Sequence, residues 1–549
     1  MTALDVRSLP EHALPGLAER VRNQILETVS RTGGHLSSSL GAVELVIALL
    51  RAFDPQKDKV LWDVGHQAYA WKILTDRGAR FDSLRQIDGI SGFPNPDESP
   101  CDAFVAGHAG ASLAVARGMA AARDIRGDSE HIVAVIGDAA LANGMALEAL
   151  EGYRGGRRLI LILNDNGSGV VQFDSEALLK SFGFNVLPRQ NGHDISELER
   201  TFARAKEMDG PVAIPVRTVK GHGFAPAEAN PEAWHGVGAF DLSSPSPGRG
   251  DGSLGWSDAF GRALVNLARH DSRICALTAA MCEGTGLSDF AREFPDRFFD
   301  VGICEENLVA FAAGLAKEGM RPVVAVYSTF LQRAVDQVMH DVCLLRLPVV
   351  FAIDRAGCVG HDGRTHHGLF DIPMLRCLPG LTIAQPSSEC ELGGMLAMAL
   401  ESNVPWAIRY PRGRAVVSCE KAEGLKPGFA RQLFGGSAKI QIWALGDQVS
   451  KARLIAEILE SKGHSVGVVD ARFVKPFDTR LLGGQRASGA VIVSLENGSV
   501  AGGFGEVIGA DLRLGWPDDF IDHGAVEDLE RRHGLDVPSL VSRIEEFVK

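Results

Sequence analysis

The chain has 549 residues, of which 45% are apolar and 23% charged, and its formal net charge is −13. A chain of this length exceeds what one hydrophobic core normally organises, so we expect several domains, and the ordinary composition excludes a largely disordered protein. The negative charge is spread along the chain without a basic run, which argues against nucleic acid as a partner.

No apolar stretch has the length that a membrane span needs, and the first ten residues lack the apolar segment of a signal peptide. We therefore expect a soluble, cytoplasmic protein without a membrane partner. The nine cysteines form no Cys-x-x-Cys pair and mostly stand inside apolar runs. This pattern predicts reduced, small hydrophobic side chains and disfavours a zinc site or a disulfide framework.

The N-terminal region begins with apolar positions at helical spacing over residues 15–52. A polar run at residues 33–39 interrupts this pattern, and we expect it to be a loop outside the core. Residues 132–136 and 159–163 are short, continuous apolar runs with a helical pattern at residues 145–150 between them. This order predicts a βαβ unit with a parallel sheet.

Two further α/β units follow in the chain. Residues 322–326, 331–345 and 348–353 are predicted as strand, helix and strand. A third unit begins near Gly435, and its predicted elements lie at residues 440–443, 451–462, 465–470 and 490–494. The expected fold class is therefore α/β, with three consecutive domains that each contain a mostly parallel sheet flanked by helices.

A stretch rich in Ser, Pro and Gly separates the first unit from the second, and this composition is typical of an exposed linker. We place the linker at residues 243–254. The three domains are then expected at residues 1–242, 255–425 and 426–549.

Two oxygen-bearing side chains, Asp138 and Asn166, follow the two strands of the first βαβ unit. Because the carboxyl ends of parallel strands meet at one edge of the sheet, we expect these side chains to converge. A carboxylate and an amide oxygen suit magnesium, which completes its shell with water and phosphate oxygens and so indicates a diphosphate-bearing cofactor. Their spacing of 28 residues resembles the thiamine-diphosphate fingerprint. The alternative is that Asp138 only caps the following helix.

An acidic pair, Glu305 and Glu306, opens a helix predicted in the second domain. A thiamine cofactor needs one carboxylate against its aminopyrimidine ring to promote deprotonation of the thiazolium carbon, and Glu305 is our candidate for this role. The alternative is that both acids only stabilise the first turn of the helix through its dipole.

Five longer segments resemble the 1-deoxy-D-xylulose-5-phosphate synthase family, which is transketolase-like. They are residues 33–45 (GGHLSSSLGAVEL), 62–69 (WDVGHQAY), 327–334 (YSTFLQRA), 353–357 (IDRAG) and 409–413 (RYPRG). The resemblance extends over nearly the whole chain and implies three transketolase-like domains, thiamine diphosphate with magnesium, and a homodimer. It also implies condensation of decarboxylated pyruvate with D-glyceraldehyde 3-phosphate to 1-deoxy-D-xylulose 5-phosphate and CO2, for isoprenoid and thiamine precursors.

The resemblance further implies roles for individual residues. The magnesium ligands would be Asp138, Asn166 and the main-chain oxygen of Ser168. The contacts to thiamine diphosphate would come from His66, Gly107, His108, Ala109, Ala139, Ala140, Asn166, Phe224, Glu305 and Phe330. The catalytic groups beside Glu305 would be the polar residues that face the reacting carbons, namely His35, His66, His235, Asp362 and His366. The acceptor phosphate would be bound by Tyr327, Arg355 and Arg412.

The chemistry of these residue types agrees with such roles. A carbanion that attacks an aldehyde needs a nearby acid, which imidazole can supply near pH 7. A lone histidine is more often structural, so the inference depends on His35 and His66 each standing in a glycine-rich loop. Arginine suits a phosphate because its planar fork holds two oxygens at once.

The chain departs from the family pattern at several positions. Ala139 stands where the family has Gly and adds a methyl group near the diphosphate. Asn307 replaces His and Phe224 replaces Tyr, and each change removes a polar or titrating group. After Asn166 only residues 170–180 intervene where the family has a long mobile segment that can act as a lid.

These departures leave two alternatives open. The first is a related transketolase-type ketol transferase with another donor or acceptor, and the second is a non-catalytic paralogue that binds the cofactor as a scaffold or sensor. Arg355, Asp362, His366 and Arg412 favour the synthase over the first alternative, because they complete its pattern. Glu305 with the metal pair favours a catalyst over the second.

Overall fold

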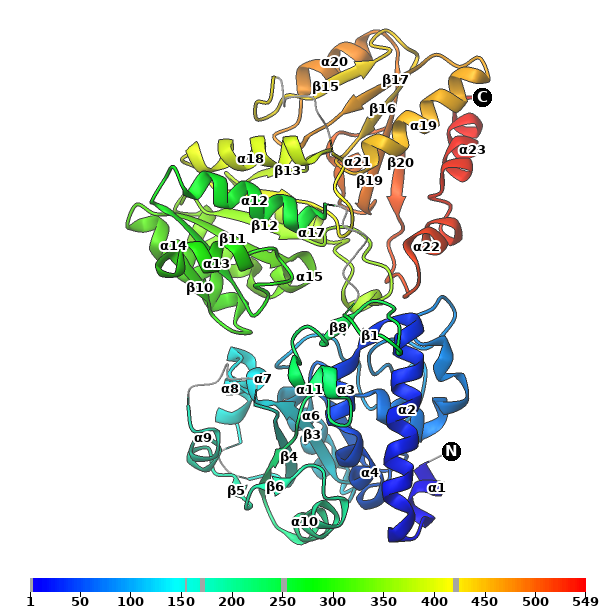
Figure 1. Ribbon diagram of the computed structural model, residues 1–549. Coiled ribbons are helices and arrows are strands. Elements are labelled where there is room, and N and C mark those ends of the chain that lie inside the picture. Colours follow the sequence, from blue (N-terminus) through cyan, green and yellow to red (C-terminus); the bar gives the residue numbers. More distant parts are fainter. Residues whose placement is uncertain (1–2, 154–155, 168–172, 248–253, 418–423) are drawn as a thin grey trace. The chain divides into compact units, whose positions relative to one another are not determined.

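The structure is a computed structural model, and it describes residues 3–153, 156–167, 173–247, 254–417 and 424–549. The chain forms two compact units, one made of residues 1–250 with 361–365 and the other of residues 251–360 with 366–549 (Figure 1). Within the described part of the chain, every helix is too short or too polar to span a lipid bilayer.

The first unit contains a parallel sheet with the strand order β2-β3-β4-β7-β5, and β6 pairs with β7. Its strands are β2 (Lys59–Trp62), β3 (Ile132–Gly137), β4 (Leu159–Asp165), β5 (Asn185–Val186), β6 (Gln190–Asn191) and β7 (Pro211–Arg217). Central strands β3 and β4 are continuous apolar runs because both faces of a parallel sheet are covered. The predicted βαβ unit is confirmed, with α8 (Gly144–Glu151) in its connection.

Amphipathic helices surround this sheet. In α10 (Ile195–Glu207) the buried residues Ile195, Leu198, Phe202 and Ala205 recur at helical spacing. The N-terminus of α10 is capped by the Asp194 carboxylate, which accepts a hydrogen bond of 2.9 Å from the Glu197 N–H. Helix α10 packs on α4 (Val43–Ala52), and α6 (Ser112–Arg126) packs on β3.

The second unit contains a seven-stranded sheet with the order β10-β9-β11-β12-β14-β13-β18. Its strands are β9 (Ile274–Thr278), β10 (Phe298–Asp300), β11 (Arg321–Tyr327), β12 (Val350–Asp354), β13 (Thr382–Ala384), β14 (Trp406–Arg409) and β18 (Phe473–Lys475). All neighbours are parallel except β13 and β18. Strand β18 thus joins a sheet whose other strands precede it by more than 60 residues.

The two faces of this sheet bury different helices. Val324 of β11 belongs to the core that includes Leu308 of α14 (Glu305–Lys317). The adjacent Val323 belongs to the core that includes Phe260 of α12 (Trp256–Ala268), which packs beside α18 (Glu389–Glu401) (Figure 1). Successive strand residues therefore serve opposite faces, as the pleat requires.

A third, five-stranded sheet has the order β15-β17-β16-β19-β20. Its strands are β15 (Arg431–Phe434), β16 (Ile440–Ala444), β17 (Val466–Asp470), β19 (Val491–Ser499) and β20 (Leu512–Trp516), and only β15 is antiparallel to its neighbour. Helix α19 (Gln448–Ser461) packs on β17, and α23 (Val537–Val548) packs on α19. The predicted fold class, with three mostly parallel sheets flanked by helices, is confirmed.

A buried acid pair lies where β17 approaches α18 in the second unit. The Ser387 Oγ lies 2.8 Å from one carboxylate oxygen of Glu391 and 2.8 Å from one of Asp470. A hydroxyl has one hydrogen to donate, so the second contact requires a proton on a carboxyl. Arg472 pairs with Glu391 at 2.7 Å, which assigns the proton to Asp470. Burial and the neighbouring Glu391 raise the pKa of Asp470 accordingly.

One predicted element differs from the structure. The helix expected over residues 331–345 is a series of short pieces, namely α15 (Ser328–Leu331), η5 (Gln332–Ala334), α16 (Val335–Gln337) and η6 (Val338–Cys343). The last is a π-helical turn. Apolar spacing near 3.6 residues cannot distinguish one continuous α-helix from a succession of tighter and wider turns.

Candidate functional site

The predicted metal pair lies at one edge of the first sheet. Strands β3 and β4 are parallel neighbours with Gly137 opposite Asn164, so Asp138 and Asn166 extend beyond two adjacent strand ends. Asp138 is also the first residue of α7 (Asp138–Leu141) and is 8% exposed. The convergence that the strand pattern predicts is therefore present at the backbone level.

Asn166 carries a buried oxygen that suits a metal. Its Oδ1 has no hydrogen-bond partner among the described residues. A buried amide oxygen without a partner is costly unless a ligand satisfies it, and magnesium prefers such hard oxygens. The preceding amide, Asn164, is in contrast satisfied, because Thr218 Oγ1 donates to it at 2.7 Å. Ser168, the third expected ligand, lies outside the described residues.

Three of the predicted histidines lie together in the first unit. The ring centroids of His66 and His235 are 5.1 Å apart, and His35 lies 6.1 Å from His66 and 5.6 Å from His235. Burial lowers the pKa of His66 well below its usual range, with His235, His35 and Lys220 acting in the same direction. Burial and then Lys220 lower the pKa of His235 to about 4. These two imidazoles are therefore neutral near pH 7.

The serine run beside His35 corrects an expectation. Residues 33–39 are not a loop outside the core: Ser37, Ser38 and Ser39 belong to α3 (Leu36–Gly41) and are at most 5% exposed. Their hydroxyls find partners, since Ser37 Oγ donates to the Pro231 carbonyl and Ser39 Oγ to the His66 carbonyl, each at 2.9 Å. Ser38 Oγ lies 3.3 Å from the ring of the clustered histidine at position 235. Satisfied hydroxyls can be buried at little cost.

The loop at residues 107–111 is fixed by Asp63, which follows strand β2. The two Asp63 carboxylate oxygens accept hydrogen bonds from the backbone N–H groups of Gly110 at 2.8 Å and Ser112 at 3.1 Å. His108 Nε2 donates to the Thr365 carbonyl at 2.8 Å, which defines its tautomer. The predicted contacts Gly107 and Ala109 are buried beside it.

The remaining predicted cofactor contacts of this unit have different surroundings. Ala139 and Ala140 form the first turn of α7, directly after Asp138. Phe224 precedes α11 (Ala225–Ala229) and packs its ring against Trp234, with centroids 5.3 Å apart, in an edge-to-face arrangement. A tyrosine hydroxyl is absent at this position, so the ring contributes apolar contact alone.

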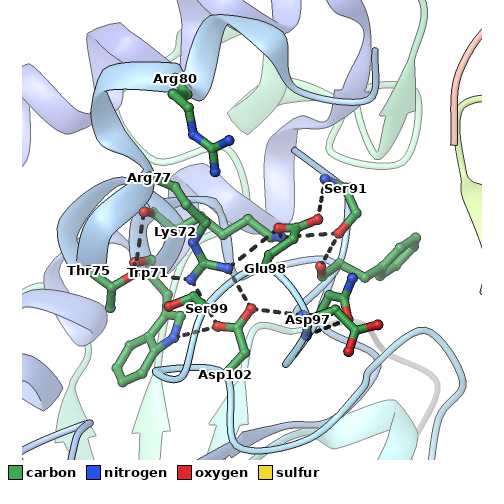
Figure 2. A network of polar contacts seen from close by, with 12 residues as sticks. Trp71, Lys72, Thr75, Arg77, Arg80, Ser91, Asp97, Glu98, Ser99 and Asp102 are labelled. Carbon is green, nitrogen blue, oxygen red and sulfur yellow. Dashed lines mark hydrogen bonds and ion pairs between the residues drawn. The ribbon is translucent and has the colours of Figure 1, made fainter. Parts of the chain in front are cut away.

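A buried ion network joins residues 71–77 to residues 91–102, as Figure 2 shows. Arg77 binds Asp102 through two hydrogen bonds of 2.5 and 2.9 Å, and both side chains are at most 1% exposed. Lys72, which is fully buried, binds Glu98 at 2.7 Å. The Trp71 indole N–H also donates to Asp102, at 3.0 Å.

The segment that this network holds, residues 91–102, packs against the histidine cluster. Residues 91–102 include Phe93, whose ring lies 5.2 Å from the His35 ring. They also include Pro94, which approaches Gly65 so closely that a Cβ at that position would lie 2.6 Å from the proline Cδ. Residues 91–102 therefore contact the ring of His35 and the backbone that precedes His66.

Residues 361–365 come from the second half of the sequence but belong to the first unit. Asp362, a predicted catalytic residue, pairs with Arg85 at 2.9 Å, and both side chains are at most 9% exposed. Arg85 also hydrogen bonds the hydroxyl of Tyr69. The same hydroxyl accepts a hydrogen bond of 3.0 Å from the His35 N–H. The predicted residues Asp362 and His35 are therefore connected through two polar side chains.

In the second unit, Glu305 is the first residue of α14 and is 2% exposed. Its carboxylate pairs with Arg333 at 3.0 Å. Burial raises the pKa of the Glu305 carboxyl, and Arg333 opposes this effect. A carboxyl buried with a raised pKa, close to a strand end, has the properties that an acid–base catalyst needs. Glu306 is only half-buried, so the two acids of the predicted pair differ.

An aromatic and cationic group surrounds the end of strand β11. Phe330 stacks on Tyr327 with centroids 5.7 Å apart and meets the ring of His366 edge-on at 5.6 Å. The Arg355 guanidinium carbon lies 3.8 Å from the Tyr327 ring centroid, within cation–π distance. Four of the predicted residues of this unit therefore lie together.

Arg412 interacts electrostatically with Asp354, as Arg355 does. Burial raises the pKa of Asp354, at the end of β12, to about 6, and Ser257, Arg355 and Arg412 act against this effect. Ser257 Oγ donates to the Asp354 carboxylate at 2.6 Å. Two guanidinium groups near one buried acid make a region that suits an anion. Asn307, a departure from the family pattern, is exposed on the first turn of α14.

A second cluster of metal-binding residue types has a structural explanation. Within the described ranges, Glu44, His193 and His222 bring ligand atoms within 4.8 Å of one another. His193 uses both ring nitrogens, because Nδ1 lies 3.1 Å from Glu44 and Nε2 accepts from the Val219 N–H at 3.0 Å. Glu44 also pairs with Arg22 at 2.5 Å. These satisfied groups form a polar support and leave little for a metal ion.

Several residues of the site were not singled out from the sequence. Asp63 holds the loop at residues 107–111, Arg85 pairs with Asp362, and Arg333 pairs with Glu305. Asp63 stands inside the segment WDVGHQAY, directly after a strand, and that position was a usable signal. No local sequence pattern indicated the roles of Arg85 and Arg333, because their partners are 277 and 28 residues away in the chain.

Comparisons with known proteins agree with this arrangement. Residues 1–173 match the family model described as 1-deoxy-D-xylulose-5-phosphate synthase, residues 252–416 match the transketolase pyrimidine binding domain, and residues 435–540 match the transketolase C-terminal domain. The chain resembles the transketolase of Campylobacter jejuni in fold, with a TM-score of 0.50 and 19% identity over 98% of this chain and 100% of that one.

Two curated relatives cover almost the whole chain. The 1-deoxy-D-xylulose-5-phosphate synthase of Oleidesulfovibrio alaskensis is 43% identical over 604 aligned positions, which cover 97% of this chain and 94% of that protein. The enzyme of the same name from Aquifex aeolicus is 42% identical over 609 positions, which cover 99% and 97%. Both alignments are longer than the 549 residues of this chain, so these relatives contain segments that it lacks.

The matches extend over all three sheets, and the pyrimidine binding match contains Glu305, Tyr327, Arg355 and Arg412. Full-length identity above 40% is shared with proteins of one name. The chain therefore belongs to the 1-deoxy-D-xylulose-5-phosphate synthase family of transketolase-type transferases, a thiamine-diphosphate-dependent family that condenses pyruvate with glyceraldehyde 3-phosphate.

Proposed function

We propose that Asp138, Asn166 and the main-chain oxygen of Ser168 hold a magnesium ion that binds the diphosphate of thiamine diphosphate. The observation that supports this most is the buried Asn166 Oδ1, which has no hydrogen-bond partner among the described residues and follows the strand beside that of Asp138. Magnesium keeps water and phosphate ligands, so three protein oxygens suffice. The proposed contacts to the rest of the cofactor are His66, Gly107, His108, Ala109, Ala139, Ala140, Asn166, Phe224, Glu305 and Phe330.

Glu305 is the proposed acid–base group at the aminopyrimidine ring. Its buried carboxyl has a pKa raised by burial, and the paired Arg333 opposes this shift. It can therefore exchange a proton with a ring nitrogen near neutral pH. When bound, thiamine diphosphate supplies the electron sink for the decarboxylation of pyruvate.

The neutral imidazoles of His66 and His235, with His35 beside them, are the proposed proton donors and acceptors at the reacting oxygens. A neutral imidazole offers one donor and one acceptor nitrogen, so it can both hold a carbonyl oxygen and take up a proton. Asp362 and His366 complete the proposed catalytic set, and Asp362 also holds Arg85.

Tyr327, Arg355 and Arg412 are the proposed binding residues for the phosphate of D-glyceraldehyde 3-phosphate. The support for this is the placement of Arg355 over Tyr327 and the effect of both arginines on the Asp354 pKa. Two guanidinium groups can neutralise a dianionic phosphate and hold its oxygens in a fixed plane.

The proposal includes the wider organisation of the protein. We infer domains at residues 1–242, 255–425 and 426–549, joined by the linker at residues 243–254. We also infer a homodimer, because two-fold dimers are the commonest closed assembly. A cytoplasmic location fits a pathway enzyme that acts on small phosphorylated substrates.

The test is the complete reaction. The purified protein is incubated with pyruvate, D-glyceraldehyde 3-phosphate, thiamine diphosphate and Mg²⁺, and CO2 and the five-carbon ketose phosphate are measured. Equal amounts of both products are expected. Ketol transfer from a ketose phosphate without CO2 would establish the related ketol transferase instead, and cofactor binding without any turnover would establish the non-catalytic paralogue.

A pair of variants tests the metal site. Asp138→Asn should weaken the Mg²⁺-dependent binding of thiamine diphosphate, measured by titration calorimetry. The matched control is Asp165→Asn, because Asp165 stands at the end of the neighbouring strand β4 and is already paired with Arg189. Equal effects of the two substitutions would remove Asp138 from the proposed metal site.

A further inference from the structure

Asn497, on strand β19 of the third sheet, lies against the loop that carries Arg355. We define this loop as residues 355–360 and call it the Arg355 loop. The Asn497 Oδ1 accepts hydrogen bonds from the Cys358 N–H at 3.0 Å and from the Trp516 indole N–H at 2.9 Å. Its Nδ2 donates to the Asp447 carboxylate at 3.0 Å. Every polar atom of this side chain is therefore used.

The orientation of the Asn497 amide is determined by its partners. Backbone and indole N–H groups only donate, and the carboxylate of Asp447 accepts, so the amide has one orientation that satisfies all three. Asp447 is in turn held by Gln385 Nε2 at 2.7 Å and Gln448 Nε2 at 2.8 Å. The strand therefore presents a rigid acceptor to the Cys358 N–H.

The backbone of the Arg355 loop is strained and closely packed. Arg355 has a φ of 57° and Gly357 a φ of 84°. Non-glycine residues rarely adopt such values, and they persist when the surroundings impose them. A Cβ on Gly357 would lie 2.3 Å from the Asn497 Cγ. The amide thus packs directly on the loop, which the Gly357–Gly368 backbone hydrogen bonds of 2.7 and 2.8 Å also hold.

The position of this loop decides where the Arg355 guanidinium points. Its carbon lies 3.8 Å from the Tyr327 ring centroid, and its Nη2 would lie 3.7 Å from a Cβ placed on Gly284. A guanidinium fork recognises phosphate only in a defined orientation, so a small shift of the backbone misdirects it. Cys358 is 5% exposed, and without Asn497 its buried N–H loses an acceptor.

We propose that Asn497 is a positioning residue, which acts through the Arg355 loop to orient Arg355 toward the phosphate of the acceptor. The inference rests on the proposed phosphate-binding role of Arg355. The third sheet would thus contribute to selection of a phosphorylated acceptor. Asn497 acts indirectly, because it binds the backbone of Cys358, which is three residues after Arg355 in the chain.

The test compares two acceptors, D-glyceraldehyde 3-phosphate and D-glyceraldehyde, which lacks the phosphate. The readout is the ratio of their kcat/KM values in the holoenzyme, because general damage to the fold or to the cofactor site lowers both values and leaves the ratio unchanged. Arg355→Ala is the reference and should lower the ratio by about 100-fold, and Asn497→Ala should lower it by about 10-fold through a raised KM. Gln448→Ala is the matched control, since the Gln448 side chain hydrogen bonds the same Asp447 carboxylate, while Asn497 is the residue that accepts from the Cys358 N–H.

A double substitution keeps the test decisive if Asn497→Ala folds poorly. Asn497→Asp places two carboxylates together and should lower the ratio. Asn497→Asp with Asp447→Asn exchanges donor and acceptor, with the Gln448 amide turned over so that its oxygen accepts, and should restore the ratio to within about threefold of the unmodified protein. An unchanged ratio in Asn497→Ala, or no recovery in the double variant, would overturn the proposal while Arg355 keeps its role. An unchanged ratio in Arg355→Ala would instead overturn the phosphate-binding assignment and this inference with it.

Discussion

Removing one charge from the buried ion network of Arg77, Asp102, Lys72 and Glu98 should lower the stability of the protein strongly. Asp102→Leu would leave the Arg77 guanidinium, 1% exposed, without its bidentate partner. The next acidic groups lie at 3.2 Å on Asp76, which is half-exposed, and at 3.6 Å on Glu98, which already binds Lys72. Removing one member of a buried pair typically costs about 3–5 kcal/mol. The unfolding temperature of the first unit should fall by about 10 °C.

The assay is scanning calorimetry of the full-length protein with thiamine diphosphate and Mg²⁺ present. Arg77→Met combined with Asp102→Leu should recover about half of the lost stability, because the uncompensated charge is removed. The other half stays lost, because the N–H groups of Trp71 and Asn95 still lack the carboxylate that they bind at 3.0 and 2.8 Å. Arg126→Ala, in an exposed ion pair, is the control and should leave the unfolding temperature nearly unchanged. A loss below about 1 kcal/mol in Asp102→Leu would show that the Arg77–Asp102 pair contributes little to stability.

Three further predictions concern titrating groups. Lys220→Met should raise the pKa of His235, because the Lys220 ammonium group lowers that pKa. NMR titration of the His235 imidazole measures the shift, and an unchanged pKa would contradict an interaction between Lys220 and His235. Arg333→Met should raise the pKa of Glu305 further and move the acid limb of the kcat–pH profile to higher pH; an unmoved limb would contradict their pairing. Asp470 has a raised pKa, so the folded protein keeps a proton that the unfolded chain releases, and stability should fall as the pH rises above the ordinary carboxyl range. Asp470→Asn should flatten this dependence in urea unfolding series, and an equal slope in both proteins would contradict it.

Much of the fold follows from local patterns in the sequence. Strands β3, β4 and β11 contain continuous apolar runs, and such runs identify buried parallel strands without knowledge of their neighbours. The segment at residues 331–345 was wrongly predicted as one helix, because turns of different width bury similar positions.

The burial of Ser37, Ser38 and Ser39 could not be predicted from the local sequence. Three consecutive serines indicate a solvated loop, yet they are buried because carbonyl groups near residues 66 and 231 accept their hydroxyls. Partners this far away in the chain leave no trace in the local pattern. The ion pairs Arg85–Asp362 and Arg333–Glu305 are of the same kind.

The candidate site was predictable where chemistry follows a strand end. Asp138 and Asn166 could be named because parallel strands align their carboxyl ends. The second group, around Tyr327 and Arg355, was identified only through resemblance, since nothing local indicates that a guanidinium stacks on that ring. The support from Asn497 could not be predicted, because it depends on how one sheet packs against a loop of another.

The role of Glu305 as the acid–base group is tested most directly by the substitution Glu305→Gln, which keeps the size of the buried side chain and removes its titrating proton. Turnover of pyruvate and D-glyceraldehyde 3-phosphate should fall by at least about 100-fold, while the dissociation constant of thiamine diphosphate with Mg²⁺, measured by titration calorimetry, should change by less than about threefold. Turnover within a few-fold of the unmodified protein would contradict the assignment of Glu305 as the acid–base group.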